Sequence, residues 1–151
     1  MKYLDEPVVQ SFLPDEKLAQ GIVQEAHTGH QTPLVERLRQ GLPMAEFRSL
    51  RDLLLIPEEE LGRLLGISPA TLNRRKKAMS RLTTTESERI VRFARLFGLT
   101  LEVFEDEETT REWLKTNNPG TANESPLSYA DTEFGAREVE NLLGRIDHGV
   151  F

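Results

Sequence analysis

The chain has 151 residues, of which 38% are hydrophobic and 29% charged, and this balance excludes an intrinsically disordered protein. It contains no cysteine, which excludes disulfide bonds and thiolate chemistry. Although the net charge of the chain is −6, residues 61–97 hold nine basic and two acidic residues, and this local charge of +7 predicts a polyanion-binding surface.

The sequence also lacks the features of a membrane or exported protein. Asp5, Glu6 and Pro7 interrupt any apolar region of a signal peptide, and no apolar run approaches the roughly 18 residues that cross a bilayer. We therefore expect a soluble, cytoplasmic protein without a membrane partner.

Nearly every patterned stretch has helical spacing, so we predict an all-α fold. Residues 1–30 are expected to form an N-terminal helical segment of open role, with a helix that begins near Pro14. A second helix should end at Gly41, because glycine is favoured just past a helix C-terminus. The next helix follows from an apolar stripe at i, i+3 and i+7, formed by Phe47, Leu50 and Leu54.

Two start signals come next. Ser68-Pro69 places serine at an N-cap and proline at the first helical position. Thr85-Glu86-Ser87-Glu88 fits a capping box that opens a helix through Phe97, and Gly98 should end this helix. We therefore predict a helix-turn-helix domain over residues 31–98 and a separate C-terminal domain over residues 99–151.

The acidic C-terminal domain is also predicted to be helical. Short helices are expected over residues 101–104 and around residues 110–115, followed by a loop over residues 117–123 that is rich in Asn, Pro and Gly. A last helix over about residues 132–147 follows from the apolar positions Val139, Leu142, Leu143 and Ile146.

The region around Gly66 has the spacing of a helix-turn-helix motif. Leu61 and Leu65 should face the core, Gly66 suits a turn with positive φ, and Leu72 should anchor the second helix. The side chains expected to contact DNA are Ser68, Thr71, Asn73, Arg74, Arg75 and Lys77. Asn and Arg can pair with base edges, while Ser, Thr and Lys can hold phosphates. The alternative is that this basic run is an ordinary solvated face.

Enzymatic and metal-binding readings find little support in the sequence. His27 and His30 lie near Glu25, but the intervening Gly29 makes a regular helix doubtful, and a loop pair of histidines is favoured over zinc ligands. No phosphate-binding glycine loop or nucleophile elbow occurs. We therefore predict a protein that is not an enzyme and holds no cofactor or metal.

Two stretches of the C-terminal half resemble a known family. RLTTTESERIVRFARLFGLTLEVFEDEETTREWLKTNNPG and SPLSYADTEFGAREVENLLGRIDHGVF look like the Xre/ParS-type antitoxins that partner RES-domain toxins. The markers are Ser87-Glu88-Arg89, Trp113-Leu114, Asn118-Pro119, Pro126-Leu127, Thr132, Gly135, Val139, Leu142-Leu143, Arg145-Ile146 and Gly149. The resemblance covers about Leu34 to Phe151.

The resemblance implies a two-part antitoxin that acts without catalysis. The helix-turn-helix would bind operator DNA, usually as a homodimer, and repress its own operon. The C-terminal domain would bind a RES-domain toxin, encoded by a neighbouring gene, and keep NAD out of its active site. The residues expected to contact the toxin are Glu140, Arg145, His148, Val150 and Phe151.

Two other functions remain open at this point. The chain could be a stand-alone transcriptional regulator whose acidic C-terminal domain mediates dimerisation. It could also be an interaction protein whose helix-turn-helix no longer binds DNA, because a protein of net charge −6 is repelled by phosphate at long range.

Overall fold

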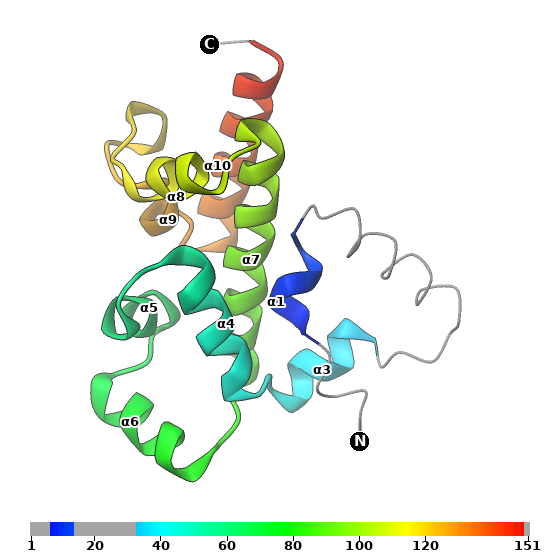
Figure 1. Cartoon of the computed structure of the whole chain (residues 1–151), viewed down its shortest axis with the longest axis vertical. Helices are drawn as coiled ribbons and strands as arrows, with labels where there is room; N and C mark the ends of the chain where they lie inside the picture. The colour runs from blue at the N-terminus through cyan, green and yellow to red at the C-terminus, as the bar shows by residue number, and fades with distance from the viewer. Residues whose placement is uncertain (1–6, 14–32, 150–151) are drawn as a thin grey trace.

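A computed structural model describes residues 7–13 and 33–149 of the chain, and within these residues it contains helices and no strand. The long helix α7 (Thr84–Phe104) runs through the centre, and the other helices pack around it (Figure 1). The predicted all-α class is confirmed. No helix among the described residues is long and apolar enough to cross a membrane.

Four helices surround the N-terminal half of α7. They are α3 (Leu34–Gln40), α4 (Met44–Leu54), α5 (Glu58–Leu65) and α6 (Pro69–Ala78). The helix predicted to end at Gly41 and the apolar stripe predicted for α4 are both confirmed, and the stripe side chains Phe47, Leu50 and Leu54 are buried.

The C-terminal half packs along the remainder of α7. It consists of α8 (Glu107–Lys115), the 3-10 turn η2 (Pro119–Thr121), α9 (Pro126–Tyr129) and α10 (Glu133–Asp147). The helix α10 lies beside α7 and buries Ala136, Val139 and Leu143 (Figure 1). Both halves of the chain therefore share one core along α7.

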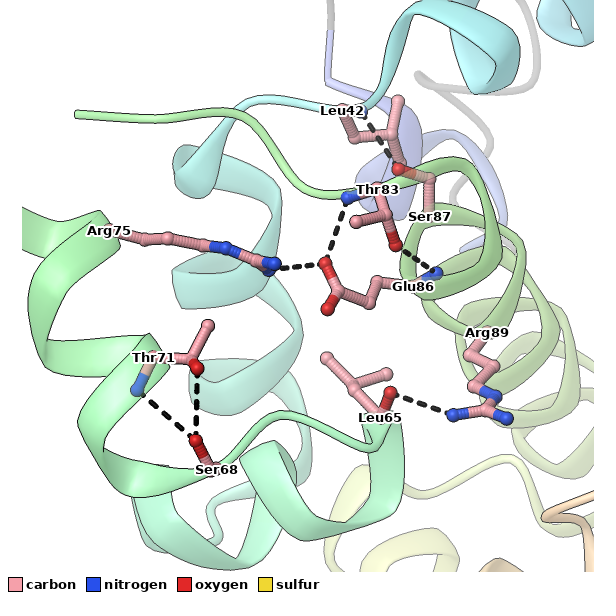
Figure 2. Close-up of polar contacts among 9 residues, drawn as sticks. All are labelled: Leu42, Leu65, Ser68, Thr71, Arg75, Thr83, Glu86, Ser87 and Arg89. Atoms are coloured by element: carbon pink, nitrogen blue, oxygen red, sulfur yellow. Dashed lines mark hydrogen bonds and ion pairs between the residues drawn. The ribbon is translucent and has the colours of Figure 1, made fainter. Parts of the chain in front are cut away.

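The start of α7 differs from the prediction by two residues. Thr83 is the N-cap: its Oγ1 accepts the Glu86 backbone N–H at 3.2 Å, and the Glu86 carboxylate accepts the Thr83 N–H at 2.8 Å. The predicted capping box at Thr85 is wrong, because Thr85 already lies within the first turn of α7. The buried Ser87 holds this turn in place, since its Oγ accepts the backbone N–H of Leu42 at 2.9 Å (Figure 2).

Gly98 does not end a helix, contrary to the prediction. Helix α7 continues to Phe104, so the short helix expected over residues 101–104 is its last turn, and the predicted domain boundary lies inside it. Gly98 instead permits a close approach, because a Cβ there would lie 2.1 Å from the backbone oxygen of Phe12.

A short helix, α1 (Val8–Ser11), covers this side of α7 and precedes the position near Pro14 where the sequence predicted a helix in residues 1–30. The buried carboxylate of Glu46 accepts the N–H groups of Val8 at 2.7 Å and Val9 at 3.0 Å, and so satisfies the start of α1. The helix predicted from Pro14 lies outside the described residues, as do His27 and His30.

Candidate functional site

The motif formed by α5 and α6 has the predicted core. Leu61, Leu65 and Leu72 are all buried. Gly66 has φ +77° at the end of α5, the left-handed conformation that glycine adopts without strain. The lack of a side chain at Gly62 lets the turn pack closely against α5, because an added Cβ would lie 3.2 Å from the backbone oxygen of Ile67. The sequence prediction of a helix-turn-helix is confirmed.

Ser68 fixes the start of α6. Its Oγ accepts the backbone N–H of Thr71 at 3.2 Å, and its hydroxyl donates to Thr71 Oγ1 at 3.0 Å (Figure 2). Ser68 and Thr71, both predicted to contact DNA, therefore hydrogen-bond to each other at the N-terminus of α6. The N-terminus of a helix also favours the binding of a phosphate. Ser68 is exposed and Thr71 is half-buried.

The exposed face of α6 carries three side chains suited to DNA recognition. Asn73, Arg74 and Lys77 are exposed and have no hydrogen bond or ion pair within the described part of the chain. They occupy positions i, i+1 and i+4 of one helix, so all three can reach a single groove or phosphate strand. Together with the exposed Ser68, these three side chains are the part of the predicted site that the structure leaves accessible.

Arg75 departs from the predicted placement. Its side chain is 15% exposed and its guanidinium pairs with the Glu86 carboxylate, which also closes the capping box at Thr83 (Figure 2). The expectation that Arg75 lies on the exposed face with Arg74 is wrong. Its contact instead ties α6 to the first turn of α7.

Replacing Arg75 with alanine should destabilise the fold by about 2 kcal/mol, because it leaves a largely buried Glu86 carboxylate without its cation. Urea unfolding followed by circular dichroism measures this change. Arg74→Ala removes the same kind of side chain from the neighbouring exposed position and should change stability by less than about 0.5 kcal/mol. Equal stabilities for the two variants would contradict the assignment of Arg75 to the fold.

Other cations of the basic segment also bind the chain itself. Arg81 donates to the Gly41 carbonyl at 3.0 Å, and Arg89 donates to the Leu65 carbonyl at 2.8 Å. Lys76 pairs with Glu58 at 2.8 Å. The local charge of +7 counted from the sequence therefore exceeds the charge that is free to meet a phosphate.

Two further arginines of this segment join α7 to α10. Arg92 Nε lies 3.2 Å from Glu133, and Arg95 pairs with both Glu133 and Glu140 at 3.0 Å. Burial works against ionisation of Glu133, but the hydrogen bonds and charges of Arg95 and Arg92 outweigh it and lower the pKa of Glu133. Burial likewise disfavours the charged form of Arg95, yet the two carboxylates raise its pKa.

We expect Glu133→Gln to destabilise the fold by about 0.5 kcal/mol near pH 7, because the Glu133 side chain is 49% exposed and solvent screens the pairs. The pKa of Glu133 is lowered in the folded state, so its contribution is present above the ordinary value of about 4.5 and is lost as pH falls further. Thermal unfolding of both proteins between pH 3.5 and 7 should give curves that converge at the acidic end. A constant difference across this range would contradict the assignment.

The residues predicted to contact a toxin differ in how accessible they are. Glu140 is half-buried and held by Arg95, whereas Arg145 and His148 are exposed at the end of α10. Val150 and Phe151 lie outside the described residues. No group of three His, Asp or Glu side chains in the described part could hold a metal ion.

Two family models match adjacent parts of the chain. Residues 33–95 match the antitoxin Xre-like helix-turn-helix domain, and residues 100–149 match the antitoxin Xre/MbcA/ParS C-terminal toxin-binding domain. The two matches meet within α7, so this helix is common to both regions.

Three relatives align over most of their length. Antitoxin Xre of Yersinia enterocolitica is 37% identical over 121 residues, 80% of this chain and 82% of the relative. Antitoxin Xre of Photorhabdus laumondii is 32% identical over 114 residues, 75% of this chain and 77% of the relative. A Sphingobium protein named Prs ADP-ribosylating antitoxin is 23% identical over 123 residues, 76% of this chain and 77% of the relative.

Proposed function

Because the chain belongs to the Xre/MbcA/ParS antitoxin family, we propose that it neutralises a RES-domain toxin and represses its own operon. The family resemblance drawn from the sequence is confirmed, and with it the prediction that the chain is not an enzyme, since this antitoxin family is non-enzymatic.

The C-terminal half of the chain would bind the toxin. The observation that carries this proposal is the match of residues 100–149 to a toxin-binding domain. In the proposed mechanism this half covers the active-site cleft of the toxin and excludes NAD. Arg145 and His148 are available for such contacts because both are exposed on the end of α10.

The chemistry of the toxin is proposed to consume NAD. One relative carries the printed name Prs ADP-ribosylating antitoxin, which supports a link between this kind of antitoxin and ADP-ribosyl chemistry. Transfer of ADP-ribose to a protein and hydrolysis of NAD both break the bond to nicotinamide, so either reaction is blocked by keeping NAD out of the cleft.

Helix α6 would contact the bases and phosphates of the operator. Asn73, Arg74 and Lys77 provide one amide for base recognition and two cations for base edges or phosphates. We expect a homodimer on DNA, because a single helix of this kind reads one half-site and a dimer places two recognition helices about one helical turn apart. We propose that this activity takes place in the cytoplasm, where both the operator DNA and the NAD pool would be found.

The direct test of neutralisation uses the purified product of the adjacent gene. Its release of nicotinamide from NAD should fall in proportion to added full-length chain and cease near a fixed molar ratio. Unchanged nicotinamide release at a large excess of this chain would contradict the proposal. In that case a stand-alone regulator would be the better account of the helix-turn-helix.

The choice of variants in such tests follows from the shared core. Removing α10 would uncover the face of α7 that it packs on and would leave Arg92 and Arg95 without their carboxylates. Deleting the C-terminal half would therefore damage the helix-turn-helix as well. Point variants on exposed positions separate the two functions more cleanly.

A further inference from the structure

The outward face of α10 carries a row of exposed side chains that we call the α10 stripe. Its members are Phe134, Arg137, Asn141 and Arg145 of the helix and His148, which directly follows it. Their spacing of three or four residues places them on one side of the helix. The buried residues of the helix, including Val139, lie on the opposite side. The stripe thus points away from the core along the whole length of α10.

Phe134 is the apolar member of the stripe. It is 75% exposed, and among the described residues it is the one large exposed hydrophobic side chain within the region matched to the toxin-binding domain. Burying an exposed phenylalanine in a partner yields roughly 1.5 to 3 kcal/mol. Aromatic side chains are also frequent anchors of protein interfaces.

The cations of the C-terminal half are concentrated on the same stripe. Residues 98–151 hold four basic and twelve acidic residues. Arg111 donates to the Leu53 carbonyl at 2.7 Å, and Lys115 donates to the Leu54 carbonyl at 3.0 Å, so these two cations are used within the fold. Arg137 and Arg145 are exposed and have no hydrogen bond or ion pair among the described residues.

We propose that the α10 stripe is the toxin-docking surface and that it fits an apolar groove with an acidic rim. Phe134 enters the groove, while Arg137 and Arg145, about 12 Å apart along the helix, pair with carboxylates on the rim. This inference rests on the proposed antitoxin function and adds which face binds and the charge of its partner. The net negative charge of the C-terminal half would by itself suggest a basic partner, whereas the α10 stripe indicates an acidic one.

The exposed phenylalanine favours a protein over DNA as the occupant of the stripe, because Phe134 gains free energy on entering an apolar pocket. The stripe also lies away from α6, which occupies the opposite end of the molecule from the end of α10 (Figure 1). A toxin docked there leaves Asn73, Arg74 and Lys77 free for an operator.

The test measures the affinity of the full-length chain for the purified product of the adjacent gene by calorimetry. Phe134→Ala should weaken the complex roughly 30-fold, and Arg137→Glu with Arg145→Glu roughly 100-fold. Arg137→Lys with Arg145→Lys keeps the charges and should retain most of the affinity. The matched control is Arg39→Glu with Arg48→Glu, the same change of charge at exposed positions of α3 and α4, which should bind like wild type.

The outcomes separate this inference from the function on which it rests. Failure of the wild-type chain to bind would overturn the proposed function and this inference together. Normal binding by wild type and by both stripe variants would overturn the inference alone. It would also be overturned if the stripe variants kept toxin binding but lost self-association in sedimentation, or lost affinity for DNA.

Discussion

Replacing Arg74 and Lys77 with alanine should weaken binding of the chain to its own promoter DNA about 100-fold near 0.15 M salt. Both side chains are exposed on α6 and have no partner in the described part of the chain, so their charges are available to the DNA. If each neutralises one phosphate, the slope of log K against log salt should become less steep by about 2. Fluorescence anisotropy of a labelled promoter fragment over a series of salt concentrations measures both quantities.

The control for this prediction removes two charges elsewhere. Arg39→Ala with Arg48→Ala changes exposed arginines on α3 and α4 and should leave the slope and the promoter affinity close to wild type. Toxin inhibition by the α6 variant should be unchanged, because α6 lies far from α10 (Figure 1). An unchanged salt slope in the Arg74 and Lys77 variant would exclude α6 as the DNA-contacting helix.

Gly135→Ala should destabilise the C-terminal half by roughly 1 to 3 kcal/mol and impair toxin inhibition. A Cβ at Gly135 would lie 2.0 Å from the backbone oxygen of Tyr129, so α10 would have to move away from the end of α9. A backbone atom cannot yield as a side chain can, and overpacking of this kind is costly. Thermal unfolding and the nicotinamide-release assay measure the two effects.

The same helix supplies a matched control in Gly144. An added Cβ there has no atom within 4 Å, and alanine has the higher helix propensity, so Gly144→Ala should be neutral or stabilising by up to about 1 kcal/mol. Destabilisation of both variants by the same amount would mean that the contact with Tyr129 does not explain the effect.

The local signals of the helix-turn-helix were readable from the sequence because the interactions themselves are local. Ser68 caps α6 through a bond to Thr71, three residues away, and Gly66 ends α5 with its own backbone conformation. Periodic apolar positions identified α4 and α10 for the same reason. Residue spacing was sufficient at these positions because the interacting groups lie within a few residues of each other in the sequence.

The start of α7 was not decided by local spacing. Thr83 and Glu86 fit a capping box, and so do Thr85 and Glu88, since both pairs are three residues apart. Distant residues select the first pair: Arg75 binds Glu86, and the Leu42 N–H binds Ser87. Contacts across 11 and 45 residues have no signature in the local sequence.

Two further errors had the same long-range origin. Gly98 looks like a helix end until Phe12, 86 residues earlier, is known to lie against it. The charge count over residues 61–97 also overestimated the free cations, because it included Arg92 and Arg95, which Glu133 and Glu140 of α10 bind. A formal charge shows that a surface could be basic, and the ion pairs decide how much of the charge is free.

The most direct test of the central claim is growth and NAD content in cells that express the adjacent gene, with and without this chain. The account predicts that the neighbour alone arrests growth and depletes NAD, and that the wild-type chain restores both. The Arg74 and Lys77 variant should also restore both, whereas the Arg137→Glu and Arg145→Glu variant should not. A harmless neighbour, or a growth arrest that the wild-type chain does not relieve, would contradict the antitoxin function proposed for this protein.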